Sequence, residues 1–364
     1  MIIIRGLYVH IPFCEKICSY CDFCKRVPKN EQMIWDYLKT LKAEYETLKE
    51  RYQTIYIGGG TPSMLNVEQL KYLLAIFKDQ KPLEYTIEIN PESYTDQKGL
   101  IFKAYRVNRV SIGVQTFQER LLKPLNRQHT NKDVFFAIKN LTEIGITNIS
   151  LDLMFSLPNQ SLADLKADLA IVKKLNVKHL SYYSLILEEK TLLYQLYKKG
   201  LYKPNDSDFE ALLYEQIIKN LKSFGYKQYE VSNFAKAPRY HSLHNLLYWS
   251  LLPYDAIGAG SFGFDGKYRY SHTNNVTKYI EEPKVTKTYQ DDYTLYQDFL
   301  IFGLRKTAGI SILETKRLFK RNPLNDFPTL YSFIDQGFLK YENDWLKVSQ
   351  KGLFVLNQIV EVFI

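Results

Sequence analysis

The chain has 364 residues, 46% of them hydrophobic, and a formal net charge of +9. This length favours one large domain and a smaller one, with enough apolar residues for a sizeable core. The excess lysines are scattered rather than gathered in one basic block, so the charge does not indicate a nucleic-acid-binding arm. No apolar run is long enough for a signal peptide or a membrane span, and we therefore expect a cytoplasmic protein without stable membrane insertion.

Strand-like runs alternate with helical patterns along the first half of the chain. The predicted strands cover 7–12, 54–58, 85–90, 109–114, 149–155 and 179–186, and helical patterns between them cover, for example, 35–52, 68–77, 132–144 and 162–175. This alternation is typical of βα units that build a parallel sheet or barrel. In such folds, ligands bind at the carboxyl ends of the strands.

The alternation ends near residue 200. A helical pattern over 209–224 leads into a glycine-rich, aromatic segment, and from about Tyr289 the chain predicts three helices, a β-hairpin over 339–348 and a last helix. That order resembles a winged helix. The third helix, 327–336, carries Asp335 and no lysine or arginine, so nucleic-acid binding is the least favoured alternative. The expected domains are 1–205, 206–285 and 286–364.

Three cysteines follow the first predicted strand within eight residues, at Cys14, Cys18 and Cys21. Three thiolates suit a [4Fe-4S] cluster and leave one iron open to a small chelating ligand. Structural zinc needs four ligands and no second ligand pair is present, while four crowded cysteines do not suit a disulfide framework. Cys24 stays open as a fourth ligand, although the loop is short for that role.

Two further loops carry unusual residues after the next strands. The run Gly-Gly-Gly-Thr-Pro over 58–62 follows the second strand, and Asn-Pro-Glu over 90–92 follows the third. Glycine lets backbone amides and carbonyls approach a ligand closely. Because neighbouring parallel strands end at one edge, the three loops are expected to meet at one mouth of the barrel.

With these loops the chain resembles the radical S-adenosylmethionine superfamily, whose CxxxCxxC signature follows the first strand of a partial (β/α)6 barrel. The resemblance implies an α/β fold of that type with a C-terminal α+β winged-helix-like domain, a [4Fe-4S] cluster on the three cysteines, and S-adenosylmethionine on the open iron. The residues that it assigns to S-adenosylmethionine are Tyr8, Tyr20, Gly59, Gly60, Thr61, Glu88, Gln115, Arg127 and Asp152. Whether the cofactor is cleaved or only bound is left open, and so is enzymatic activity.

Each of these side chains also has a purely structural interpretation. Glu88 and Asp152 can be polar ends of strands, Arg127 a surface charge, and Tyr8 a core residue. Their common place at one rim favours the binding interpretation. His10 is expected to pack beside the cysteine loop.

Ordered motifs narrow the resemblance to the branch of oxygen-independent coproporphyrinogen III oxidases and HemW-type haem chaperones, and they span nearly the whole chain. Three features favour the chaperones. Cys14 leaves no room for the N-terminal extension of the oxidases, Asp22-Phe23 follows Cys21, and residues 244–249 read His-Asn-Leu-Leu-Tyr-Trp, which matches the HNxxYW motif associated with haem.

That motif implies a haem site at His244, Tyr248 and Trp249, with a packing role for His244 and ligation by His241 as alternatives. Leu243 replaces the usual arginine, and Phe262 ends a segment that lacks the family's histidine. The expected function is a haem chaperone with haem and apo-haemoproteins as partners; a homodimer is left open. The alternative is an oxidase that decarboxylates the propionates of coproporphyrinogen III.

Overall fold

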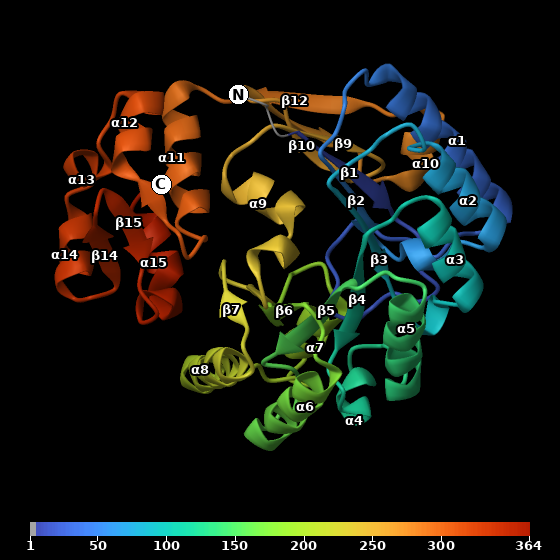
Figure 1. Ribbon diagram of the computed structural model, residues 1–364, viewed down its shortest axis with the longest axis horizontal. Coiled ribbons are helices and arrows are strands. Elements are labelled where there is room, and N and C mark those ends of the chain that lie inside the picture. Colours follow the sequence, from blue (N-terminus) through green and yellow to red (C-terminus); the bar gives the residue numbers. More distant parts are fainter. Residues whose placement is uncertain (1–4) are drawn as a thin grey trace.

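The computed structural model describes residues 5–364 and contains two sheets. The larger has 12 strands in the order β12-β11-β10-β9-β1-β2-β3-β4-β5-β6-β8-β7, and the smaller has 3 strands in the order β13-β15-β14. Figure 1 shows that the central strands curve into an open barrel with helices on its outer side. The expected α/β fold with a partial barrel and a small C-terminal domain is confirmed.

Six parallel strands form the barrel wall. They are β1 (Gly6–Ile11), β2 (Thr54–Gly59), β3 (Glu84–Ile89), β4 (Arg109–Gln115), β5 (Asn148–Phe155) and β6 (His179–Ser184). The helices between them are α1 (Glu31–Thr47), α2 (Val67–Ala75), α3 (Asp96–Ala104), α4 (Glu119–Leu122), α5 (Asn131–Glu143) and α6 (Leu162–Leu175). Each adjacent pair of strands from β1 to β6 is parallel, as βα units require.

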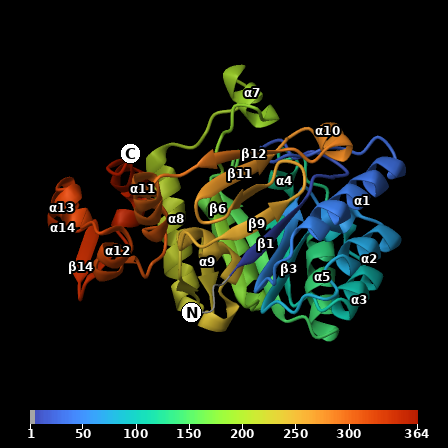
Figure 2. The same ribbon diagram turned by 90° about the horizontal axis from the view of Figure 1, so that it is seen from above.

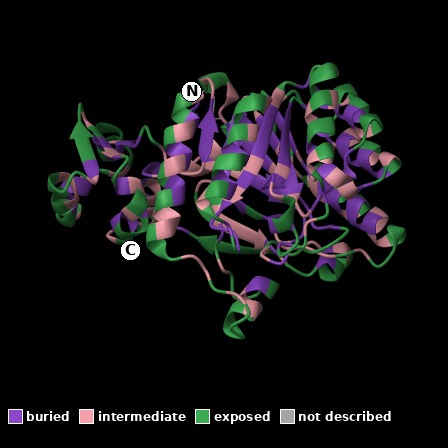
Figure 3. Ribbon diagram, turned by 90° about the horizontal axis from the view of Figure 1, so that it is seen from below, coloured by how far each residue is buried: buried purple, intermediate pink, exposed green. Residues whose placement is uncertain are grey.

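The two faces of the barrel strands differ in composition, and β2 illustrates the difference. Ile55 and Ile57 are fully buried, whereas Tyr56 between them is only half-buried. Successive side chains of a strand point to opposite faces, so the isoleucines pack under the helices and Tyr56 faces the interior. Figure 3 shows the strands largely buried and the exposed residues concentrated on the helices and loops. The interior is therefore lined with polar groups.

Four short strands extend the sheet beyond β1. They are β9 (Tyr254–Ile257), β10 (Phe262–Phe264), β11 (Tyr268–His272) and β12 (Val285–Tyr289). β9 pairs in parallel with β1, and the other three follow as antiparallel neighbours. The expected boundary between residues 285 and 286 falls inside β12. Strands of three to five residues interrupted by glycine carry too little periodicity to be recognised in the sequence.

Between β6 and β9 the chain forms α7 (Leu192–Lys198), α8 (Ser207–Ser223), β7 (Lys227–Gln228), β8 (Asn233–Ala235) and α9 (Leu243–Trp249). One more helix, α10 (Val276–Glu281), lies between β11 and β12. α7 projects from the body in Figure 2. Leu193 of α7 is nevertheless buried, and its amide donates to the carbonyl of Ser19 at 2.9 Å. The projecting segment is thereby tied to the cysteine loop.

The C-terminal domain has its own core and lies to one side of the barrel (Figure 1). It comprises α11 (Asp292–Gly303), β13 (Ile310–Ser311), α12 (Ile312–Phe319), α13 (Pro323–Asp326), α14 (Thr329–Asp335), β14 (Leu339–Glu342), β15 (Trp345–Val348) and α15 (Leu356–Glu361). Tyr296, Leu300, Leu330 and Phe363 are fully buried in that core. No helix within residues 5–364 has both the length and the apolar character needed to cross a bilayer.

Candidate functional site

The cysteine loop leaves the carboxyl end of β1 and is held by backbone hydrogen bonds at both ends. The amide of Cys14 donates to the carbonyl of Arg26 at 3.0 Å, and the amide of Arg26 donates to the carbonyl of Pro12 at 2.7 Å. In the middle of the loop, the amide of Ser19 donates to the carbonyl of Leu125 at 3.1 Å. The segment from residue 14 to residue 26 is thus a closed loop at the mouth of the barrel.

Cys14, Cys18 and Cys21 are free thiols that share this loop. Burial raises the pKa of Cys14 to about 11, the hydroxyl of Thr61 opposes that shift by donating to its Sγ at 3.6 Å, and the other two thiols raise it further. Such thiols lose their protons when a metal binds. Among residues 5–364 no three Cys, His, Asp or Glu side chains converge on a position for a single metal ion.

Cys24 is directed to a different neighbour. Its Sγ donates to the carbonyl of Asn274 at 3.2 Å, and its own carbonyl lies 2.8 Å from Nε2 of His10. Because a carbonyl only accepts, Nε2 of His10 carries the proton and Nδ1 accepts from the hydroxyl of Tyr8 at 2.9 Å. Burial lowers the pKa of His10 to about 4. His10 does more than pack beside the loop, because it links Tyr8 to the end of that loop.

The glycine run after β2 lies directly against the cysteine loop. The amide of Gly60 donates to the carbonyl of Ile11 at 2.7 Å, and the amide of Thr61 donates to the carbonyl of Phe13 at 2.8 Å. A Cβ at Gly60 would lie 2.7 Å from the carbonyl oxygen of Phe13, which is backbone and cannot rotate away. Gly59 has a φ of +112°, a conformation that side chains disfavour. Gly60 is therefore required by a close backbone approach, and Gly59 by its backbone conformation.

Two carboxylates face the barrel interior from β3 and β5. Glu88 accepts from the hydroxyl of Tyr56 at 2.6 Å and from the amide of Gly59 at 3.1 Å. Asp152 accepts from the hydroxyl of Ser111 at 2.7 Å, and Oγ of Ser150 lies 3.2 Å from its Oδ1. Burial raises the pKa of both carboxyl groups, that of Glu88 to about 7.

The raised pKa of Glu88 predicts a pH-dependent stability. Between about pH 4.5 and 7 the folded protein keeps a proton that the unfolded chain has released, so folding becomes less favourable as the pH rises through this window. Glu88→Gln removes the titrating carboxyl group. We expect this variant to lose up to about 3 kcal/mol less of its free energy of unfolding across this pH window than the wild type. Urea unfolding of both proteins at about pH 5 and about pH 8, free of S-adenosylmethionine, measures the difference.

Other buried carboxyl groups of raised pKa, such as Asp168 and Glu230, contribute equally to wild type and variant, so the difference between the two curves isolates Glu88. Parallel pH curves for the two proteins would contradict the prediction.

Arg127 reaches into the mouth between the loops. Its Nη1 donates to Oδ1 of Asn90 at 2.9 Å and its Nη2 to the carbonyl of Gly113 at 2.6 Å, while Nη1 also lies 3.8 Å from Sγ of Cys18. Its Nε is buried and has no hydrogen-bond partner. Oε1 of Gln115 is likewise buried without a partner, and the backbone of Gln115 has a φ of +59°. These atoms suit a polar ligand held between the strands.

A small, open pocket lies at this point. Its lining includes Cys18, Thr61, Asn90, Glu92 and Arg127, which come from the loops after four different strands, β1 to β4. The expected convergence of three loops at one mouth is therefore what the structure shows.

The structure brings most of the expected S-adenosylmethionine residues to this mouth or to the interior beneath it. Tyr20 packs against a small apolar cluster that includes Leu121 and Leu193, and burial raises the pKa of its hydroxyl. The sequence analysis did not assign roles to the side chains of Asn90, Tyr56, Ser111 and Ser150, which hold Arg127, Glu88 and Asp152 in place. Tyr56 and Ser111 could have been identified from the alternation of inward-facing and outward-facing residues along β2 and β4.

The HNxxYW segment lies away from the mouth of the barrel. Residues 243–249 form the helix α9 rather than a loop, and His244 is only 1% exposed. Its Nδ1 lies 2.8 Å from Oγ1 of Thr54, at the start of β2, and its Nε2 lies 2.7 Å from the hydroxyl of Tyr248. Burial, aided by the charge of Arg109, lowers the pKa of His244 to about 3. Both ring nitrogens are therefore engaged, at the opposite end of the strands from the cysteines.

The other end of α9 contacts the C-terminal domain. The guanidinium of Arg305 lies 5.4 Å from the ring centroid of Trp249, and the ring of Phe302 lies 6.3 Å from it. Nζ of Lys306 donates to Oγ of Ser250 at 3.1 Å. At its first turn, α9 is held by Glu84, whose carboxylate accepts the amides of residues 243 and 244. α9 is thus fixed between the barrel and the C-terminal domain.

A partial βα barrel with three free cysteines after its first strand and a glycine-rich turn after its second defines the radical S-adenosylmethionine class of proteins. Residues 8–171 match the model of the Radical SAM superfamily. The coproporphyrinogen III oxidase HemN from Escherichia coli, a radical SAM enzyme, has the same fold with a TM-score of 0.86 over 99% of this chain and 90% of that chain, at 19% identity.

Sequence comparison is more specific. The heme chaperone HemW of Bacillus subtilis is 37% identical over 99% of both chains, that of Lactococcus lactis is 35% identical over 99% of this chain and 97% of the relative, and that of Escherichia coli is 32% identical over 99% and 98%. The chain belongs to the HemW family within the radical SAM superfamily.

Membership of the superfamily implies a [4Fe-4S] cluster and S-adenosylmethionine. The residues of the mouth fit both groups, because three free thiols share one loop and Arg127 presents an unpaired N–H beside them. When bound, the cluster supplies the electron of radical SAM chemistry. The protein's own groups would bind and orient these two cofactors. The glycine run lets its backbone approach a ligand closely, and the interior carboxyl groups offer hydrogen-bond acceptors.

Proposed function

We propose that this protein binds haem and passes it to apo-haemoproteins in the cytoplasm. The observation that carries the proposal is identity of 32–37% over nearly the full length to three proteins named heme chaperone HemW. The likeness to coproporphyrinogen III oxidase, at 19% identity, concerns the fold and gives no support to oxidase activity.

Within this proposal, Cys14, Cys18 and Cys21 ligate the [4Fe-4S] cluster. Arg127 takes the carboxylate of S-adenosylmethionine, for which its unpaired Nε–H and its place beside Cys18 are the support. Glu88 and Asp152 accept hydroxyl groups of the same ligand from the barrel interior. Tyr8, Tyr20, Gly59, Gly60, Thr61 and Gln115 complete the contacts.

Haem titration of the anaerobically reconstituted protein, followed by absorbance, tests the proposal. We expect micromolar binding and transfer of the bound haem to apomyoglobin used as an acceptor. The assay also includes coproporphyrinogen III with dithionite and S-adenosylmethionine. Absence of haem binding, or release of carbon dioxide from coproporphyrinogen III, would overturn the chaperone proposal.

A further inference from the structure

The six histidines of the chain differ in how their ring nitrogens are used. Five of them place at least one ring nitrogen in a hydrogen bond, namely His10, His129, His179, His244 and His272. His241 is the exception within the described residues 5–364. An imidazole with free nitrogens is the form that binds a metal without first breaking protein contacts.

The ring of His241 is nevertheless held in one orientation. It stacks on the ring of Tyr229 with a centroid distance of 3.9 Å and an interplanar angle of 10°, and the residue is half-buried. Stacking covers a face of the imidazole and leaves its edge free. A metal binds in the plane of the ring, at that edge, so the stacked orientation does not obstruct ligation.

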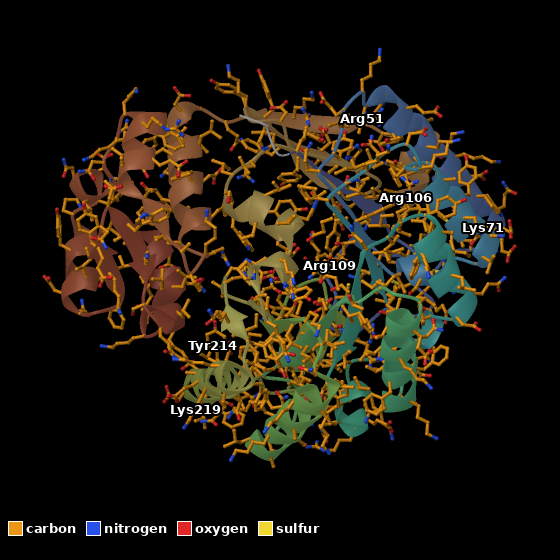
Figure 4. The ribbon with its side chains drawn as sticks, viewed as in Figure 1. Arg51, Lys71, Arg106, Arg109, Tyr214 and Lys219 are labelled. Carbon is orange, nitrogen blue, oxygen red and sulfur yellow. The ribbon has the colours of Figure 1, made fainter. Side chains whose placement is uncertain are left out.

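Tyr229 is fixed in turn by a buried chain of hydrogen bonds. Nδ1 of His179 lies 3.2 Å from Nη2 of Arg109, and because a guanidinium only donates, Nδ1 accepts and Nε2 carries the proton. Nε2 of His179 donates to the hydroxyl of Tyr229 at 2.8 Å, and the amide of Ser242 donates to the same oxygen at 3.0 Å. Figure 4 shows Arg109 in the interior of the barrel, where this chain begins.

These hydrogen bonds hold the ring of Tyr229, and the stacking contact in turn orients the ring of His241, so the hydrogen-bonded chain acts on His241 through Tyr229 and leaves its nitrogens unoccupied. Arg109 and His179 are 2% and 0% exposed, and the proposed binding of S-adenosylmethionine uses neither of them. Their side-chain hydrogen bonds join them to each other, to Tyr229 and to Ser150.

The residues that flank His241 in the sequence combine exposed apolar, aromatic and charged side chains. Leu243 is a large apolar side chain with 38% exposure, and the guanidinium of exposed Arg239 lies 4.9 Å from the ring centroid of half-buried Tyr240. An apolar side chain and an aromatic ring suit a flat macrocycle, while a guanidinium suits a carboxylate. Haem combines these features, because its ring is apolar and its edge carries two propionates.

We propose that His241 is the axial ligand of haem and that His244 instead holds α9 in place. The inference rests on the proposed haem-chaperone function and names the ligand of that site. It assigns the iron to a side chain whose nitrogens are free, rather than to one whose two nitrogens contact Thr54 and Tyr248.

A ligand-exchange experiment on the full-length reconstituted protein tests the assignment. Haem titration and magnetic circular dichroism are recorded for wild type, His241→Ala and His241→Cys. We expect His241→Ala to weaken haem binding by roughly tenfold or more, and His241→Cys to convert the ferric spectrum from histidine to thiolate ligation. A structural role of His241 would not produce the thiolate spectrum.

His244→Gln is the matched variant, because glutamine retains hydrogen bonding in the buried position. We expect the wild-type haem spectrum in this variant, with a lowered melting temperature. Wild-type spectra in both His241 variants would overturn the assignment, and so would loss of histidine ligation in folded His244→Gln alone. A wild-type protein that binds no haem would contradict the proposed function itself, which separates the two failures.

Discussion

Replacing Cys18 with serine is expected to abolish cluster assembly, so that bound iron falls from about four atoms per chain to near zero after anaerobic reconstitution. The physical reason is the number of ligands. A cluster bound by three thiolates has one protein ligand for each of three irons, so the loss of one thiolate leaves a second iron without a protein ligand. Iron and sulfide analysis together with the cluster absorbance measure the result.

Cys24→Ser is the matched control for that experiment. The thiol of Cys24 donates to the carbonyl of Asn274, and a serine hydroxyl preserves this donor. We expect this variant to keep its full iron content. Equal loss of iron in the two variants would show that four cysteines, not three, ligate the metal.

Arg127→Met is expected to weaken S-adenosylmethionine binding by about a hundredfold, while the cluster is retained. Charge-assisted hydrogen bonds contribute about 1.5–3 kcal/mol each, and a loss of about 3 kcal/mol corresponds to this factor. Methionine occupies a similar volume and removes the donors that face the pocket. Equilibrium dialysis against labelled S-adenosylmethionine, with iron analysis of the same sample, separates ligand loss from cluster loss.

Arg120→Met serves as the comparison, because Arg120 is more than half exposed and pairs with Asp164 at the surface. This variant should bind S-adenosylmethionine as the wild type does. If Arg127→Met also bound the ligand normally, or lost iron in proportion to the ligand, the assignment of the carboxylate to Arg127 would be wrong.

Most of the barrel was predictable because its strands are long and apolar. Periodicity placed the six parallel strands and helices such as α6 within one or two residues of their bounds, and α6 also has a capping box between Ser161 and Asp164. Strands β9 to β12 were not recognised as such. They are short, and β9 joins the sheet by pairing with β1, a contact between residues about 250 positions apart that no local pattern encodes.

The candidate site divides in the same way. Residues at the ends of strands, such as Glu88 and the glycine run, were recognisable because topology brings the carboxyl ends of parallel strands together. The burial of His244 was not recognisable, because the residue types of its motif fit both a haem ligand and a buried helix. Its burial is decided by contacts with Thr54 and Glu84, which lie in distant segments. The free nitrogens of His241 follow from the same packing.

The position of α9 has a consequence for attempts to isolate a minimal radical SAM barrel from this chain. Trp249 is covered by Phe302 and Arg305, so a version shortened before α11 would leave an indole ring in water. The same helix stacks His244 on Tyr56, whose hydroxyl donates to Glu88. Removing the C-terminal domain would thereby disturb a carboxyl group of the barrel interior without deleting any residue that touches it, and losses of activity after truncation would mimic mutations in the mouth.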